Sequence, residues 1–559
     1  MADGNRRSSR PRGPGYVFSA GATALLLMLG IVALNASQPP PPTVAEFAPA
    51  ALDQIKKAPD RQSSDIGDDG VKVGATGQPT PTKRPTPTVA PTPSGPPVPR
   101  SHDCPGGRQI EDPQSPPCVP GWKGDNGGAT AFGVTRDEIR VSAPYGTFLT
   151  GDPSPQWQAL VNFFNRRFEF YGRHIVLKTY VATDDNFANP DASHMQFDAS
   201  KVVEDHKSFA SLGYPDRKGS EHIYYDYLAN HHVVSIIGRE TSRGTDAYFA
   251  KHKPYQWNRG AAVDHQFKSE GQFICREWAG RPLRYGGPGW PPNVWTTPPT
   301  QRTFGIMLTS ATDGTTPDIT PLKDNLKLCG IKPVVVTATD PKDATEARNP
   351  IASFVSAKVT TIICICDLGA ARNYLDSAET QTYRPEWLMG TYINNDLDNS
   401  FSTNQPQQTR NVFGISFSDK FLPVQDSWWY AAMREGDPSV ATPPNAGPIA
   451  TYENLLLLAS GIQMAGPHLT PQTFADALHR TVFPNPRAGR APYYQGRVGF
   501  DDGGYSWHHD ASTFWYDSSQ TNTDDPTTPG RICHVRHGVR YDYGDWPKEE
   551  PPYKTTSCT

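Results

Sequence analysis

The chain has 559 residues, of which 20% are charged, and a formal net charge of -4 at pH 7. Because 57 acidic residues outnumber 53 lysines and arginines, it lacks the general basic excess that holds proteins on a phosphate backbone. The composition therefore argues against nucleic acid as a partner, and the length is sufficient for more than one domain.

The N-terminal segment predicts a membrane anchor. Residues 1–16 form a basic cytoplasmic tail, and residues 17–36 contain an uncharged apolar run from Val17 to Leu34. A helix of about 18 residues rises about 27 Å, close to the thickness of a bilayer core. The run is long for a signal peptide and Ala33–Ala36 is a poor cleavage site, so an uncleaved signal anchor is favoured over a cleaved signal. The positive-inside rule then places the remaining chain outside the cytoplasmic membrane, or secretes it if the segment is cleaved.

Residues 37–103 are rich in Pro, Thr, Ser and Gly and contain too little apolar surface to fold. They predict a disordered linker with a bias toward polyproline conformation. A stalk that crosses the cell wall is one use of such a segment, whereas a plain linker needs no function.

The 8 cysteines are an even number, which fits disulfides in an oxidising compartment. Cys104 and Cys118 lie close together in an N-terminal extension over 104–135, and they predict one local disulfide. Cys533 and Cys558 predict a second in a C-terminal tail over 521–559. Three pairings remain open for the other four cysteines, which are Cys275, Cys329, Cys364 and Cys366.

From about residue 136 the pattern alternates between apolar strands and amphipathic helices, which indicates an α/β layer structure. The first series has strands at 139–143, 174–182 and 233–237 and helices at 156–170 and 198–212. The second has strands at 302–309, 332–338 and 360–366 and helices at 319–329 and 349–358, followed by a strand at 412–416 and a helix at 452–464. Two such units predict two Rossmann-like lobes joined by a hinge. The expected boundaries are 136–264 plus 411–447 for lobe 1, and 265–410 plus 448–520 for lobe 2.

Several local motifs occur in one order along this part of the chain. They are Pro117–Ala129 with Gly133–Ile139, then Tyr171–Ile175, Gly271–Cys275 with Gly280–Pro282, and Tyr383–Trp387. In these motifs, residues from about 104 to about 518 resemble the branched-chain amino-acid type of ABC-transporter substrate-binding protein, in a form common in actinobacteria. The resemblance implies the type I periplasmic binding protein fold, an amino acid or related amide or peptide as ligand, and an ABC permease as partner. The chain departs from the family in having no lipobox cysteine after the apolar segment, so the tether would be the segment itself.

Ligands of open α/β sheets bind at the loops that leave the carboxyl ends of the strands. These loops carry Tyr145, Thr147, Phe148, Arg239 and Thr241 in the first unit, and Asp313, Asp367 and Tyr392 in the second. The resemblance implies that first-lobe groups hold a ligand carboxylate and a second-lobe acid holds an amine, and it adds Tyr214 and Tyr255 to the site. Each candidate has a structural alternative. Thr241 also suits a helix cap, Tyr255 suits packing, and Asp367 suits the polar end of a strand.

The sequence contains no Gly-x-Ser-x-Gly elbow, Walker loop, His-Glu-x-x-His or paired Cys-x-x-Cys motif, so we expect no catalytic residue and no cofactor. We also expect no metal site at His231–His232 or His508–His509, because adjacent residues in a strand point to opposite faces. A solute receptor for an ABC importer is the first hypothesis. A sensory or scaffold protein of the cell envelope that kept the fold is the second, and an extracytoplasmic enzyme is the third.

Overall fold

The structure is a computed structural model that describes residues 112–146, 151–183, 191–215, 221–238, 244–310, 314–390, 395–443, 448–485, 495–523, 525–554 and 558. All of these residues belong to one compact unit of the chain, Val89–Thr559. The predicted tail 1–16, anchor 17–36 and linker 37–103 lie outside the described residues. Within the described part of the chain, no helix has both the length and the apolar character needed to cross a bilayer.

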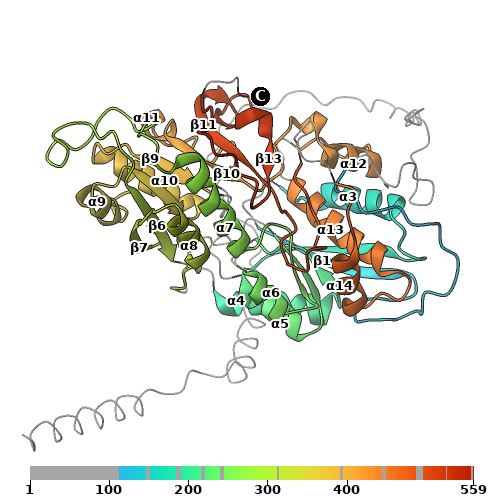
Figure 1. Ribbon diagram of the computed structural model, residues 1–559. Coiled ribbons are helices and arrows are strands. Elements are labelled where there is room, and N and C mark those ends of the chain that lie inside the picture. The colour runs from blue at the N-terminus through green and yellow to red at the C-terminus, as the bar shows by residue number, and fades with distance from the viewer. Residues whose placement is uncertain are drawn as a thin grey trace, which may run out of the picture. The chain divides into compact units, whose positions relative to one another are not determined.

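The first sheet has five parallel strands in the order β2-β1-β3-β4-β5. Figure 1 labels β1 of this sheet. The strands are β1 (Glu138–Tyr145), β2 (His174–Val181), β3 (Ala210–Ser211), β4 (Val234–Ile237) and β5 (Gln256–Asn258). The helices between them are α3 (Ser154–Arg167), α4 (Ala192–Ser200), α5 (His222–Asn230) and α6 (Asp246–Lys251). Parallel neighbours require crossover connections, and these helices supply them.

Helix α3 illustrates how the sequence builds this layer. Pro155 lies in its first turn, where a missing N–H costs no hydrogen bond. The apolar side chains at helical spacing, Trp157, Leu160, Val161 and Phe164, are all buried in the core of the first sheet. The pattern that predicted a helix over 156–170 therefore also identified its buried face.

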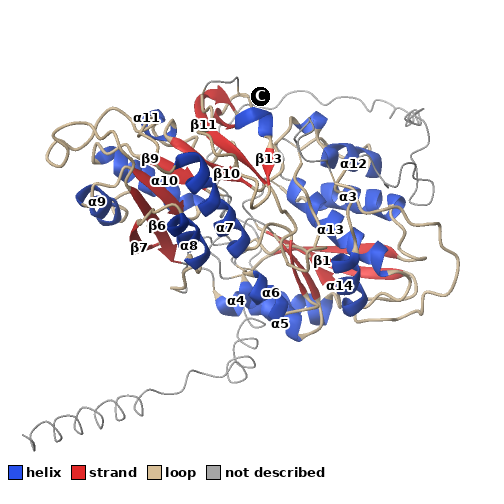
Figure 2. Cartoon of the chain, in the orientation of Figure 1, coloured by secondary structure: helices blue, strands red, loops and turns tan. Residues whose placement is uncertain are grey.

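The second sheet is mixed and has the order β12-β11-β10-β9-β8-β6-β7, with β13 paired to β11. Figure 2 labels β6, β7, β9, β10, β11 and β13 of this sheet. Its parallel strands are β6 (Phe304–Ser310), β7 (Val334–Thr339), β8 (Thr361–Ile365), β9 (Glu386–Met389) and β10 (Val412–Ser416). The antiparallel strands are β11 (Ala511–Thr521), β12 (Pro529–His534) and β13 (Arg540–Tyr541). Its helices are α7 (Val263–Phe273), α8 (Thr320–Leu328), α9 (Arg348–Ser356), α10 (Leu368–Thr380) and α11 (Pro406–Thr409). Every residue of β6 and of β8 is buried, as expected for strands covered on both faces.

Three later helices return to the core of the first sheet. They are α12 (Trp428–Gly436), α13 (Ile449–Ala465) and α14 (Pro471–Arg480). The first sheet with α3–α6 and α12–α14 is called lobe 1 below, and the second sheet with α7–α11 is called lobe 2.

Two returning segments were assigned to the wrong lobe from the sequence. Strand β10 was expected in lobe 1, within 411–447, but it pairs with β9 in the second sheet. Helix α13 was expected in lobe 2, within 448–520, but its leucines lie in the core of the first sheet. Both segments are buried almost throughout, and such a run carries no periodic pattern that indicates which core it joins.

Short strands were also missed. The expected helix over 198–212 contains the end of α4, a π-helical turn over Lys201–Asp205 and strand β3. Strand β5 lies in a segment for which we had predicted no strand. The tail 521–559, expected outside both lobes, supplies β12 and β13 of the second sheet. Strands β3, β5 and β13 have only two or three residues, which give too little sequence pattern to predict them.

The structure resolves the cysteine pairing that the sequence left open. Cys275 pairs with Cys329 and joins the end of α7 to the end of α8, and Cys364 pairs with Cys366. Cys533 pairs with Cys558, as their spacing predicted. Cys118 is also disulfide-bonded, while its predicted partner Cys104 lies outside the described residues.

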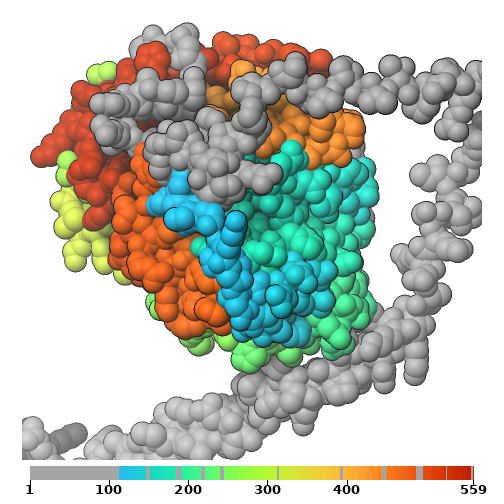
Figure 3. Space-filling model, turned by 90° about the vertical axis from the view of Figure 1, so that its right-hand side faces the viewer, coloured from blue at the N-terminus to red at the C-terminus, as the bar shows by residue number. Residues whose placement is uncertain are grey.

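The N-terminal extension packs against lobe 1. Figure 3 shows this segment, in blue, beside the orange residues of the α13–α14 region. The Pro117 carbonyl accepts a hydrogen bond from Gln463 Nε2 (3.1 Å), and Thr130 Oγ1 donates to the Leu469 carbonyl (2.5 Å). The segment that follows the predicted linker is therefore fixed to the folded part before β1 begins.

Candidate functional site

Two of the predicted ligand residues lie at the carboxyl edge of the first sheet. Tyr145 ends β1 and packs edge-on against Trp157, with ring centroids 5.9 Å apart. Tyr214 follows β3, the neighbour of β1, but it is only 3% exposed. Its hydroxyl donates to Asp198 Oδ2 (2.8 Å), and its ring lies 4.5 Å from that of Tyr224. Tyr214 is therefore a core residue whose polar group is already used.

Tyr255, a further predicted ligand residue, lies at the opposite edge of the first sheet. It directly precedes β5, so it belongs to the amino ends of the parallel strands. Its hydroxyl is hydrogen-bonded to His232 Nδ1 at 2.8 Å, and His232 lies just before β4. Position along the sequence placed Tyr255 near a strand, but only the paired sheet shows at which end of that strand it lies.

Asp367 follows β8 at the carboxyl edge of the second sheet, as predicted, but it caps a helix. Its Oδ1 accepts a hydrogen bond from the Ala370 backbone N–H at 2.9 Å, at the start of α10. The residue is 6% exposed. Asp367 therefore has the structural role weighed for it above, as a polar group at the end of a strand.

The remaining predicted ligand residues lie outside the described residues, and they are Thr147, Phe148, Arg239, Thr241, Asp313 and Tyr392.

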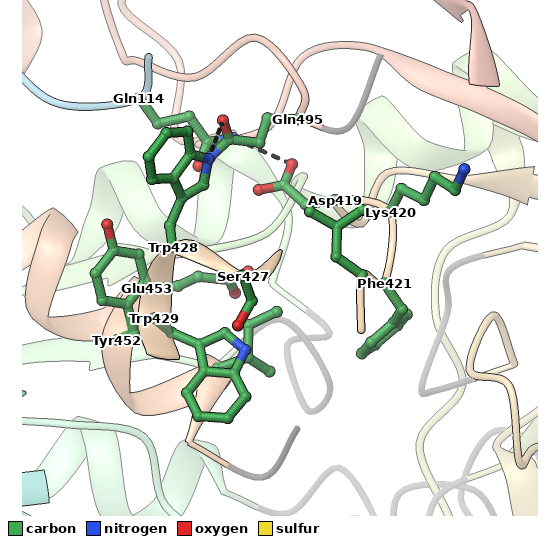
Figure 4. Close-up of a pocket in the computed structure, with 12 residues that line it drawn as sticks. Gln114, Asp419, Lys420, Phe421, Ser427, Trp428, Trp429, Tyr452, Glu453 and Gln495 are labelled. Carbon is green, nitrogen blue, oxygen red and sulfur yellow. Dashed lines mark hydrogen bonds between the residues drawn. The ribbon is translucent and has the colours of Figure 1, made fainter. Parts of the chain in front are cut away.

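A cavity lies beside the chain crossing from β10 to α12, and we call it the crossing pocket (Figure 4). Its volume is about 470 Å³, including the space at its mouth. Aromatic, acidic and amide side chains form the wall, and the lining residues are Gln114, Asp419, Lys420, Phe421, Leu422, Ser427, Trp428, Trp429, Ile449, Tyr452, Glu453 and Gln495. A wall that combines aromatic side chains with a few polar groups is typical of small-molecule sites.

The first turn of α13 places the crossing pocket next to the carboxyl edge of the first sheet. Tyr452 and Glu453 of this turn line the pocket. The next residue, Asn454, reaches the ends of β3 and β4, because a Cβ on Gly213 would lie 3.5 Å from Asn454 Nδ2 and 3.3 Å from the Gly238 nitrogen. The pocket therefore adjoins the edge at which ligands of such sheets bind.

Asp419 is the central acidic group of the crossing pocket. Its side chain is 10% exposed, and its Oδ1 accepts hydrogen bonds from the Gly496 N–H (2.8 Å) and from Gln114 Nε2 (3.1 Å). Burial raises the pKa of Asp419 to about 6, although the nearby Arg540 guanidinium acts in the opposite direction. The carboxylate is thus held in place on one oxygen and incompletely compensated in charge.

The N-terminal extension helps to hold the aromatic wall. Asp112 is fully buried and accepts hydrogen bonds from the Tyr452 hydroxyl (2.6 Å) and from Gln495 Nε2 (2.8 Å). Gln495 Oε1 in turn accepts from Trp428 Nε1 (3.1 Å). Residues far apart in the chain therefore fix the two rings, and no local motif in the sequence pointed to them.

The second acid of the pocket, Glu453, is neutralised within the protein. It forms an ion pair with Arg259, which follows β5 and is fully buried. This pair joins the first turn of α13 to the end of the first sheet, so Glu453 has a structural role and leaves Asp419 as the acid facing the cavity.

The histidines considered for metal binding are engaged in other contacts. His508 Nδ1 lies 3.9 Å from Asp419 Oδ1, and His509 Nε2 donates to the Gly499 carbonyl at 2.8 Å. His231 Nδ1 is hydrogen-bonded to the Tyr227 carbonyl at 2.8 Å. Among the described residues, no three His, Cys, Asp or Glu side chains are grouped in a way that would hold a metal ion.

Glu270 on α7 is a buried acid of lobe 2 that the sequence analysis missed. It is 3% exposed, and its carboxyl oxygens lie 3.5 Å from the position of a Cβ on Gly390, at the end of β9. Burial raises the pKa of Glu270 to about 8, so the carboxyl group is protonated at neutral pH. Because a glutamate on a helix is usually exposed to solvent, no pattern of residues indicated that this one is buried.

The raised pKa of Glu270 predicts that the free energy of unfolding falls as pH rises toward 8. In the unfolded chain this group ionises near pH 4.3, whereas the folded protein retains the proton up to about pH 8. The folded state therefore binds more protons between these two pH values, and the free energy of unfolding falls across the interval by on the order of 5 kcal/mol for this group, of which about 3 kcal/mol is lost between pH 6 and pH 8. Glu270→Gln should remove that part of the loss, measured as urea midpoints at pH 6 and pH 9.

Glu277 serves as the reference in this experiment, because burial also raises its pKa to about 8 and it remains in the variant. Part of the fall in the free energy of unfolding between pH 6 and pH 9 should therefore persist in Glu270→Gln. It should disappear only when Glu277→Gln is added. Equal losses in the parent protein and in Glu270→Gln would show that Glu270 is ionised in the folded state.

The chain matches no family model and no curated protein. Among solved structures it is similar to an ABC transporter substrate binding protein from Aeropyrum pernix, with 11% identity and a TM-score of 0.50 over 73% of this chain and 96% of that chain. It is also similar to a solute binding protein from R. palustris in complex with 4-hydroxybenzoate, with 11% identity and a TM-score of 0.46 over 74% of this chain and 98% of that chain. A third similar structure is a fatty acid ABC transporter substrate-binding protein from Thermomonospora curvata, with 13% identity and a TM-score of 0.47 over 74% of this chain and 94% of that chain. The likeness to the Aeropyrum protein shows that the chain has the α/β fold of the type I periplasmic solute-binding proteins of ABC transporters.

Proposed function

We propose that the protein is an extracytoplasmic solute-binding protein that captures a small molecule and presents it to an ABC importer. The observation that carries the proposal is a pocket of aromatic and acidic side chains beside a crossing between two α/β lobes. Chain crossings of this kind act as hinges when lobes close around a ligand. The fold and the absence of catalytic motifs in the sequence support a binding role over an enzymatic one.

The same proposal includes the finer predictions from the sequence. The ligand is an amino acid or a related amide or peptide, and the segment 17–36 tethers the protein to the membrane. Loop residues at the carboxyl edges contribute to the site together with Tyr145, and they are Thr147, Phe148, Arg239, Thr241, Asp313 and Tyr392. Cys104 pairs with Cys118 in the N-terminal extension.

A sensory or scaffold protein of the cell envelope is the second candidate. It is favoured by the internal use of two predicted ligand residues, since Tyr214 bonds to Asp198 and Asp367 caps α10. A protein that kept the fold without transport would need no free polar groups at these positions.

Thermal melting of the full chain against a panel of amino acids, amides, short peptides and sugars distinguishes the two candidates. A ligand that binds only the folded state stabilises it by about 2.7 kcal/mol at a hundredfold excess over Kd, so the melting midpoint should rise clearly with one class of compound. An unchanged midpoint across the whole panel would favour the scaffold.

A further inference from the structure

Within the part of the chain that the structure describes, one carboxylate oxygen of the crossing pocket, Asp419 Oδ2, accepts no hydrogen bond. Both hydrogen bonds that the described residues give to Asp419 end on Oδ1. In Figure 4 the other oxygen points toward Trp428 and Ser427 across the cavity. The side chain is nine-tenths buried, so this oxygen has little water to replace a partner.

The charged groups around Asp419 leave this oxygen available. The Arg540 guanidinium is bound to Asp510 (Nε–Oδ1, 2.9 Å) and to the Ser418 and Phe417 carbonyls (2.7 and 2.9 Å). His508 approaches the opposite oxygen, Oδ1, at 3.9 Å. In Figure 4 the Lys420 ammonium points away from the Asp419 carboxylate.

Other acids near the pocket have partners of their own. Glu453 is paired with Arg259, and Asp112, which adds to the negative field at Asp419, is bound by Tyr452 and Gln495. The negative charge at the open oxygen of Asp419 therefore attracts a cationic group of a ligand and repels an anionic one.

The remaining wall suits an apolar or aromatic body. Trp428 and Trp429 lie on one side of the cavity, and Phe421 lies across from them (Figure 4). Indole rings attract organic cations through their faces and pack well against other rings. Such a wall next to a buried carboxylate recognises a ligand with an apolar body and a cationic end.

We infer that the crossing pocket binds a small organic cation, namely a primary ammonium group on an aromatic or apolar body, with Asp419 as its counter-ion. The inference rests on the proposed function and names the ligand class of that site. The ammonium group donates to the open oxygen of Asp419, and the body lies against Trp428 and Trp429. The bound charge offsets the cost of burying the carboxylate.

Isothermal titration calorimetry of the full chain with three probes of similar shape tests this inference. The probes are 2-phenylethylammonium, 2-phenylethanol and phenylacetate, which differ in the charge of the polar end. The ammonium probe should bind at least about 10-fold more tightly than the alcohol, because a charge-assisted hydrogen bond is the stronger one, and phenylacetate should bind least. Equal affinities for the ammonium probe and the alcohol would overturn the inference.

Asp419→Asn is the decisive variant. Asparagine keeps an oxygen for the Gly496 N–H and Gln114, but it removes the charge, so the ratio of ammonium to alcohol affinity should fall to about 1. Asp426→Asn is the matched control, because Asp426 is exposed on the neighbouring turn and does not line the pocket. The control should keep the parent ratio. Unchanged discrimination in Asp419→Asn would overturn the inference.

The pH profile provides a second readout that a structural role of Asp419 would not produce. The ammonium affinity of the parent protein should fall as pH drops below about 6, where Asp419 takes up a proton, while the alcohol affinity stays level. Asp419→Asn should abolish this dependence.

If no probe binds but another compound of the melting panel does, the inference fails and the proposed function stands. If nothing binds at all, both fail.

Discussion

Arg302→Met should lower the free energy of unfolding by about 3–5 kcal/mol, because it leaves the Glu386 carboxylate buried without its counter-ion. The two side chains are 2% and 0% exposed. The pair is bidentate, with Arg302 Nε 2.8 Å from Glu386 Oε2 and Nη2 3.0 Å from Oε1. Thr361 Oγ1 donates to the same carboxylate at 2.8 Å, so one ion pair joins the starts of β6, β8 and β9.

Urea unfolding of the full chain, followed by tryptophan fluorescence, measures this effect as a shift of the midpoint. The double variant Arg302→Met with Glu386→Leu removes both charges and should recover a large part of the loss. The matched control is Arg140→Met, because Arg140 pairs with Glu138 at the surface, where the side chains are 34% and 38% exposed. This exposed pair should contribute at most about 1 kcal/mol. Equal losses in the two single variants would contradict a buried, specific pair.

Gly436→Ala should destabilise lobe 1 by about 3 kcal/mol and weaken ligand binding in the same protein. Gly436 ends α12 where this helix packs on α3, and a Cβ there would lie 1.7 Å from the Ala159 carbonyl oxygen. The bidentate ion pair of Arg167 on α3 with Glu435 on α12 (2.8 and 2.8 Å) also holds the two helices together at this contact. The two helices must therefore separate to admit one methyl group, and close-packed interiors accommodate such shifts poorly.

The functional part of this prediction follows from the position of α12. The helix begins with Trp428 and Trp429, so a shift at its far end moves the aromatic wall of the crossing pocket. Gly369→Ala is the control, since a Cβ at this position in α10 meets only Asp367 Oδ1 within 4 Å, at 3.3 Å. It should change the melting midpoint little and leave ligand binding intact. A Gly436→Ala protein that melts and binds like the parent would show that α12 and α3 do not approach this closely.

The sequence by itself determined the layer structure of the protein. The alternation of short apolar strands with amphipathic helices predicted an α/β fold in two units, and the buried strands β4 and β8 lie within the segments predicted for them. The spacing of apolar residues in α3 also predicted its buried face. These features depend on local periodicity, which a single sequence contains in full.

Only the tertiary structure decided how the segments are combined. An apolar strand such as β10 satisfies either sheet, and Tyr255 could lie at either end of a strand until the neighbouring strands were paired. The crossing pocket brings Gln114, Asp419 and Gln495 together although hundreds of residues separate the first from the other two. Contacts between residues so far apart depend on which cores the chain joins, and no local pattern of residues encodes that choice.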